Sequence, residues 1–131
     1  MNRKRLAVAA SLPILAALLV SAPPAMASGG DPGHEASGSC SGSTDWKIKA
    51  KPDDGRIEVE LEIDSNVSGQ VWAVKITDNG TKVFKGQRTT GGASGSFSVQ
   101  RSIANRAGAD SIVARSRDLS SGQLCVGRLT F

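Results

Sequence analysis

The sequence predicts an all-β protein, an antiparallel β-sandwich of about seven strands with one disulfide. Three observations lead to this prediction. From residue 44 onward, apolar residues alternate with polar ones; turn segments rich in Gly, Asn and Asp separate the alternating stretches; and the chain has two cysteines. A period of two residues is typical of strands, whereas helices need 3.6. We therefore expect residues 44–131 to form one sandwich domain.

The first 27 residues have the features of a secretory signal peptide. A basic segment, Arg3 to Arg5, precedes an apolar run, Leu6 to Val20, and Ala25 to Ala27 provide the small residues of a cleavage site. The run of fifteen residues is shorter than a membrane-spanning helix requires. We expect residues 1–27 to be cleaved, the protein to be secreted, and no part of it to stay inserted in a membrane.

Residues 28–43 are rich in Gly and Ser and contain almost no apolar side chain. Such a segment cannot bury a core, so it predicts a flexible leader. The single histidine of the chain, His34, lies in this segment and is expected to be solvated. Cys40, near its end, would be joined to Cys125 by a disulfide, because an even number of cysteines in an exported chain indicates oxidation.

The first predicted hairpin joins Asp45 to Lys51 with Arg56 to Asp64. A four-residue turn at Pro52 to Gly55 uses residue types that turns favour. Pairing across this turn places Ala50 opposite Ile57 on the inner side and Lys49 opposite Glu58 on the outer side.

The second predicted hairpin joins Gln70 to Asp78 with Thr81 to Arg88, around an Asn-Gly turn. A bare two-residue turn would place Phe84 beside Lys75, away from the apolar side. A three-residue loop would place Phe84 beside Val74 instead, and we favour this arrangement because it gathers the apolar side chains on one face.

The last three predicted strands are Phe97 to Ile103, Ser111 to Arg117 and Gln123 to Phe131. A turn-rich connection, Ala104 to Asp110, separates the first from the second. In the final hairpin a four-residue loop pairs its two strands as Ile112 with Leu129, Ala114 with Gly127 and Ser116 with Cys125. All five aromatic residues of the domain then fall on the inward side and form part of the core.

Two stretches carry a resemblance to a known group of proteins. Cys40 to Asn66, with its C-S-G-S-T-D-W start, and Ala104 to Asp110, A-N-R-A-G-A-D, resemble small secreted actinobacterial proteins of unknown function. The resemblance implies a signal peptide, two cysteines and a sandwich of the immunoglobulin or fibronectin type III kind. The Cys…Trp…Cys pattern of antibody domains is not matched, because Cys40 precedes the first predicted strand. The resemblance therefore implies fold and location but no activity.

The charge of the chain does not indicate a nucleic-acid ligand. The whole sequence has a net charge of +4, but removal of Arg3 to Arg5 leaves a domain close to neutral. Within that domain, residues 28–64 hold nine acidic and four basic residues, and residues 65–131 hold three acidic and nine basic ones. In a sandwich this division predicts an acidic face opposite a basic face.

The residues predict no catalytic, cofactor or metal site. A nucleophile needs a positioned base, and His34 in a flexible leader cannot serve as one. The carboxylates of Glu58, Glu60 and Glu62 lie on a solvated strand face, so a hydrolase that uses Asp or Glu is a remote alternative. Asp53 and Asp54 are explained by their turn and lack the spacing of a calcium loop.

One surface has an unusual composition. The outward side of the final hairpin combines aliphatic and arginine side chains, Val113, Arg115, Arg117, Leu124, Val126 and Arg128. We expect Val71, Ala73 and Lys75 on the neighbouring strand. Such mixtures occur in interfaces. We therefore expect a non-enzymatic binding module with an extracellular protein or a cell-surface partner. The alternatives are a carrier of a small apolar ligand between the sheets, and a protease inhibitor that presents the loop Thr89 to Ser94.

Overall fold

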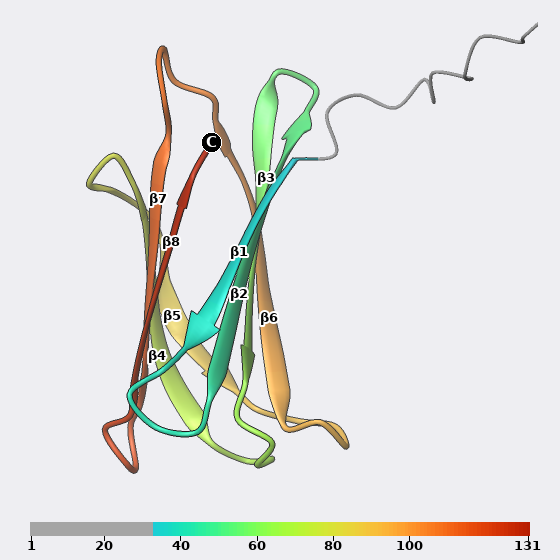
Figure 1. The fold of residues 1–131 in the computed structure, drawn as a ribbon, viewed down its shortest axis with the longest axis vertical. Helices are drawn as coiled ribbons and strands as arrows, with labels where there is room; N and C mark the ends of the chain where they lie inside the picture. The colour runs from blue at the N-terminus through green and yellow to red at the C-terminus, as the bar shows by residue number, and fades with distance from the viewer. Residues whose placement is uncertain (1–32) are drawn as a thin grey trace, which may run out of the picture.

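The computed structural model describes residues 33–131, so the predicted signal peptide and residues 28–32 lie outside the described residues. The described part is all-β, and its eight strands form two antiparallel sheets (Figure 1). The strands are β1 (His34–Ser39), β2 (Asp45–Asp53), β3 (Arg56–Asp64), β4 (Val71–Asp78), β5 (Thr81–Thr89), β6 (Ser96–Ala104), β7 (Ser111–Asp118) and β8 (Leu124–Thr130).

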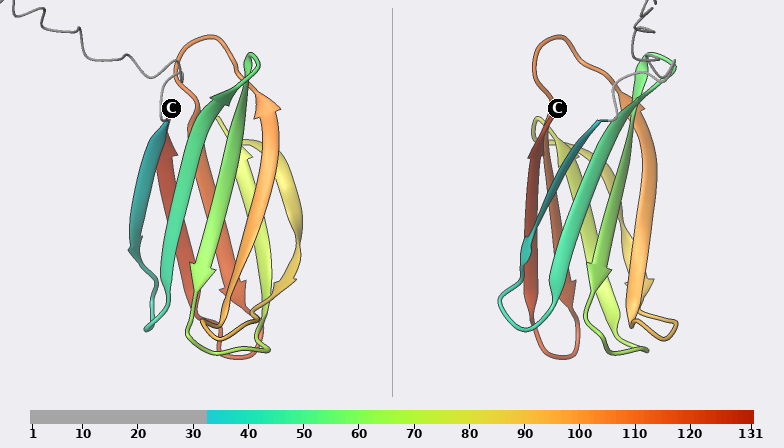
Figure 2. Two further views of the ribbon diagram at one scale, coloured as in Figure 1. Left: turned by 90° about the vertical axis from the view of Figure 1, so that its right-hand side faces the viewer. Right: turned by 45° about the vertical axis from the view of Figure 1, so that its right-hand side comes forward.

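Sheet A has the strand order β1-β2-β3-β6, and sheet B has the order β5-β4-β7-β8. Consecutive strands pair in β1–β2, β2–β3, β4–β5 and β7–β8, while the connections after β3, β5 and β6 cross between the sheets (Figure 2). Immunoglobulin-like sandwiches combine hairpins and crossings in this way. The predicted fold class is therefore confirmed, with one strand more than expected.

The core fills the space between the two sheets. Alternate residues of every central strand point inward and are buried, and the largest of them are Trp72, Ile48, Ile57, Leu61 and Ile76. The Trp72 ring of sheet B meets the Phe97 ring of sheet A at a centroid distance of 6.4 Å. The predicted inward side of each strand is thus the buried side, although Trp46 and Phe131 are only partly buried.

The three predicted hairpins differ in how well their register was anticipated. The final hairpin pairs Ile112 with Leu129 and Ser116 with Cys125, as expected. The first hairpin turns more tightly, through Asp54 and Gly55 with positive φ angles of 47° and 77°, so its register is shifted by two residues. Because the shift is even, every side chain keeps its face.

The second hairpin corrects the predicted three-residue loop. Its turn is the two-residue Asn79–Gly80, with positive φ at both positions. A β-bulge follows, because Thr77 pairs with Lys82 whereas Ile76 pairs with Phe84. Phe84 therefore pairs with Ile76 and not with Val74. The bulge adds Val83 to β5, so that Phe84 points toward the core, and Phe84 is 8% exposed.

The predicted flexibility of residues 28–43 is wrong for residues 34–43. Residues 34–39 form β1, which pairs with β2 along its whole length, and Ser41 donates its backbone N–H to the Leu124 carbonyl. The side-chain composition does not indicate this strand, because β1 is held at the edge of sheet A mainly by backbone hydrogen bonds to β2. Gly38 lies against the Trp46 ring, where an added Cβ would lie 2.8 Å from the ring atom Cζ2.

The predicted disulfide between Cys40 and Cys125 is confirmed, with a Cα–Cα distance of 4.3 Å. It joins the end of β1 in sheet A to β8 in sheet B. The partly buried Trp46 packs against the inward-facing Gly127 of β8, where an added Cβ would lie 2.8 Å from the ring atom Cε3. The edge of the sandwich where β1 and β8 meet is therefore closed by one covalent link and one large ring. Among residues 33–131, no helix is long and apolar enough to cross a membrane.

Candidate functional site

The outward side of sheet B carries a dense set of cations, which we call the basic face. Because side chains alternate along a strand, the residues opposite the buried ones share this side. Its cations come from β4, β5, β7 and β8: Lys75, Lys82, Lys85, Arg115, Arg117 and Arg128. Its apolar members are Ala73, Val113, Leu124 and Val126.

The pairing of the strands places three of these cations side by side. Lys75 of β4 lies directly opposite Lys85 of β5 and opposite Arg115 of β7. Neighbouring strands are about 4.8 Å apart, so the three side chains start from positions roughly 5 Å apart. Like charges directly opposite each other on a sheet are destabilising. The row is therefore an energetic cost of the folded domain.

The other charges of residues 65–131 do not relieve this cost. Arg88 and Arg101 lie over the Phe84 ring, at 5.0 and 4.5 Å from its centroid, and Arg106 pairs with Asp78. The acidic residues are all buried: Asp78, Asp110 and Asp118 are at most 1% exposed. Within the part of the chain that the structure describes, the six cations of the basic face have no ion pair and no hydrogen bond from their side chains.

A shallow groove of about 530 Å³ runs across the basic face. Lys75, Lys85, Arg115 and Arg117 border it, and Ala73 and Leu124 contribute apolar surface. The groove lies on the outside of sheet B and not between the sheets, where a carrier of an apolar ligand would hold its cargo. Its shape and charge suit an anionic partner that spreads over the sheet.

The structure brings together the six residues predicted from the final hairpin. Val113, Arg115 and Arg117 of β7 and Leu124, Val126 and Arg128 of β8 all lie on the basic face. Lys75 of β4 is on the neighbouring strand, as expected, but sequence reasoning did not include Lys82 and Lys85 of β5, which complete the face. Their outward position could be read from the alternation, but the contact between β4 and β7 is a crossover pairing that the alternation does not reveal.

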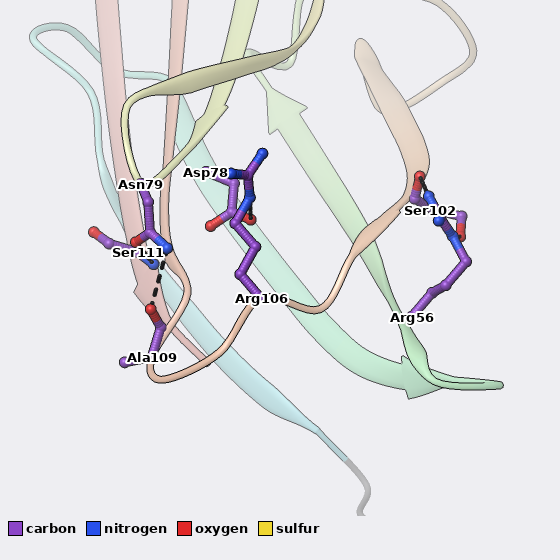
Figure 3. A network of polar contacts seen from close by, with 7 residues as sticks. All are labelled: Arg56, Asp78, Asn79, Ser102, Arg106, Ala109 and Ser111. Carbon is purple, nitrogen blue, oxygen red and sulfur yellow. Dashed lines mark hydrogen bonds and ion pairs between the residues drawn. The ribbon is translucent and has the colours of Figure 1, made fainter.

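A second cluster lies at the end of the sandwich where β6 crosses to β7 (Figure 3). The loop is held by Asn79, whose Nδ2 donates to the Ala109 carbonyl while its Oδ1 accepts the Ser111 N–H (Figure 3). Arg106 Nε lies 3.8 Å from Asp78 Oδ2. The Asp78 carboxyl faces Asp110, and three oxygen atoms of this buried pair have no hydrogen-bond partner among the described residues.

Burial raises the pKa of Asp78 to about 6, and charge repulsion from the neighbouring Asp110 carboxyl acts in the same direction. Arg106 opposes them and lowers the pKa. A charged Asp78 is costly in this buried position beside a second carboxyl group, which favours the protonated form of Asp78. The pair is enclosed, which argues for a structural role in holding the β6–β7 loop.

His34 is exposed to solvent, as expected, but the structure corrects its expected flexibility. Its Nδ1 lies 2.9 Å from the Thr130 carbonyl oxygen, and its ring packs at 5.1 Å from the Phe131 ring, so the residue is held and not free. The loop Thr89 to Ser94 is also better held than its composition suggests, because Thr90 Oγ1 accepts the Gln70 N–H. Among residues 33–131, no three His, Cys, Asp or Glu side chains form a group that could hold a metal ion.

A comparison with protein families, with curated proteins and with solved structures finds no match for this chain.

Proposed function

We propose that this protein is a secreted, non-enzymatic binding module whose basic face captures an anionic partner outside the cell. One observation carries the proposal. Six cations share the outer side of sheet B without a compensating carboxylate among the described residues, and three of them stand in one row. A surface of this kind attracts negative charge and speeds encounter with it.

The location of the protein is part of the proposal. A disulfide between Cys40 and Cys125 fits an oxidising compartment, and the first 27 residues carry the pattern of an export signal. The partner is accordingly an extracellular protein or a component of the cell surface. The apolar residues beside the cations, Leu124 and Val126, add contact area that does not depend on salt.

The test compares two triple variants with equal changes of charge. Exported protein is collected from the medium of expressing cells, immobilised, and exposed to culture medium and to a cell-envelope fraction. Arg115→Glu/Arg117→Glu/Arg128→Glu reverses three charges of the basic face and is expected to lower retention at least about tenfold. The matched control reverses three lysines of sheet A: Lys47→Glu/Lys49→Glu/Lys51→Glu.

The control variant should retain as much material as the wild type, because its charges lie on the opposite side of the sandwich. Circular dichroism establishes that each variant is folded before capture. If both variants retain the same material as the wild type, the basic face is not the binding surface and the proposal is wrong.

A further inference from the structure

The basic face is continued by a cluster of exposed aliphatic side chains at one end of sheet B. Val71, Leu119 and Leu124 are 37%, 47% and 38% exposed. Leu119 and Val71 are neighbours, because Leu119 donates its N–H to the Val71 carbonyl at 3.0 Å. Leu124 lies on β8 opposite Arg117, which is two residues before Leu119 in the chain. Together they form an apolar patch directly beside the cations, at the end where β7 turns into β8.

The composition of this combined surface distinguishes among anionic partners. Protein interfaces are enriched in aromatic residues and depleted in Lys. Three of the six cations on the basic face are lysines, and among the residues that β4, β5, β7 and β8 direct outward there is no aromatic ring. A soluble polyanion would use the cations but leave Val71, Leu119 and Leu124 without a role.

A layer of anionic lipid headgroups matches both features. Lys and Arg side chains are attracted to its negative surface potential, and aliphatic side chains can enter the boundary between headgroups and acyl chains. The long, flexible lysines tolerate a fluid surface that has no fixed positions. The other face of the molecule favours the same orientation, because the outer side of sheet A carries more acids than bases and would be repelled.

We infer that the basic face docks on a surface of anionic lipid headgroups, with Val71, Leu119 and Leu124 reaching the acyl boundary. The inference rests on the proposed function and names its partner. It places sheet B against the lipid and sheet A toward the solvent. Adsorption leaves the fold unchanged and requires no spanning segment, since the side chains involved already point outward.

The experiment measures co-sedimentation of exported protein with vesicles. One set is pure phosphatidylcholine, and the other contains about one third phosphatidylglycerol. We expect binding to the second set and not to the first. Lys75→Gln/Arg115→Gln should weaken this binding by about tenfold or more, whereas Lys47→Gln/Lys49→Gln, which removes the same charge from sheet A, should leave it unchanged.

The aliphatic contribution is measured with Leu119→Ser/Leu124→Ser. This variant keeps every cation and should bind the anionic vesicles several-fold more weakly at both low and high salt. Thermal unfolding without vesicles verifies that each variant is folded. Loss of binding in this variant separates a lipid surface from a soluble polyanion, for which the two leucines would be irrelevant.

Two results would overturn the inference. The first is the absence of binding to anionic vesicles while capture from medium still depends on Arg115, Arg117 and Arg128, in which case the proposed function stands with a soluble partner. The second is self-association of the protein alone at low salt, seen as an increase in its molecular mass. This result would show that the basic face binds the acidic outer side of sheet A in a second copy. If the wild-type protein retains nothing from the medium or the envelope fraction and also fails to bind anionic vesicles, both proposals are wrong.

Discussion

The outer faces of the two sheets carry charge in opposite arrangements. On sheet A, the lysines of β2 lie opposite the glutamates of β3, in the pairs Lys47 with Glu62, Lys49 with Glu60 and Lys51 with Glu58. Glu35 of β1 adds contacts at 3.9 and 4.0 Å to two of these lysines. Cross-strand pairs of opposite charge stabilise a sheet. Each of these lysines therefore has a carboxylate of its own sheet opposite it, although acids outnumber bases on this face.

On sheet B, the corresponding central row is Lys85, Lys75 and Arg115, three like charges abreast. The acidic residues of the same half of the chain lie in the interior and cannot neutralise them. One sheet therefore uses its charges for its own stability, and the other keeps repulsion that only an external anion can relieve. This difference explains why we assign binding to sheet B although both faces are highly charged.

The largest expected effect comes from cutting the covalent link between the two sheets. Cys40→Ala/Cys125→Ala frees a loop of 85 residues and should lower the free energy of unfolding by about 2–5 kcal/mol. Binding by the basic face, measured well below the unfolding transition, should be unchanged, because β7 still holds β8 in register. Chemical denaturation and vesicle binding measure the two quantities separately. A parallel loss of binding would mean that the basic face depends on its link to sheet A.

A second, smaller effect concerns the acids buried behind the basic face. In the folded protein the pKa of Asp78 is raised to about 6, so the folded state binds more protons than the unfolded state between pH about 4 and 6. Stability therefore falls as pH rises through this window. Asp78→Asn keeps the shape, removes the charge and should raise the free energy of unfolding at pH 8 by about 1–3 kcal/mol.

The gain in Asp78→Asn is limited by the loss of the ion pair with Arg106, which is half exposed and contributes little. Denaturation at pH 4 and pH 8 measures the effect. At pH 4 the variant and the wild type should be nearly equal, since the wild-type carboxyl is already protonated. Equal stability of variant and wild type at both pH values would show that the pKa of Asp78 is not raised in the folded protein.

The side on which each residue lies could be predicted from the sequence, because it depends only on the alternation along a strand. The register of the hairpins was harder to predict from the sequence, because it depends on the length and type of the turn. The final hairpin was anticipated correctly, whereas Asp54–Gly55 and Asn79–Gly80 form tighter turns than predicted. An even shift and a bulge preserved the inward side in both cases. The buried residues of a strand can therefore be predicted correctly even when its cross-strand partners are not.

Two features could not be read from the alternation for physical reasons. β1 has almost no apolar side chains, and its backbone bonds to β2 leave no mark on composition. The basic face requires β4 to lie beside β7, although the two are separated in sequence by β5 and β6. Only half of the face, the part built by the β7–β8 hairpin, is local in the chain. Lys75 was expected on the neighbouring strand, whereas Lys82 and Lys85 belong to the face only because β5 pairs with β4 in the same sheet.

The smallest expected effect tests the comparison most directly, because one kind of substitution should act with opposite sign on the two faces. Lys75→Glu places a carboxylate between Lys85 and Arg115 and should raise the free energy of unfolding by about 1 kcal/mol. Lys49→Glu places a carboxylate opposite Glu60 and removes the contact with Glu35, so it should lower stability by a similar amount. Thermal and urea unfolding at low salt measure both.

Binding should change in the reverse sense, with loss in Lys75→Glu and no loss in Lys49→Glu. A variant that gains stability while it loses binding has removed a repulsion that the wild type keeps for its ligand. Salt provides the internal control: at 1 M the screening length is about 3 Å, so both stability changes should shrink toward zero. If Lys75→Glu is instead destabilising at low salt, the row of cations is not a source of repulsion, and the argument that an external anion must relieve it no longer holds.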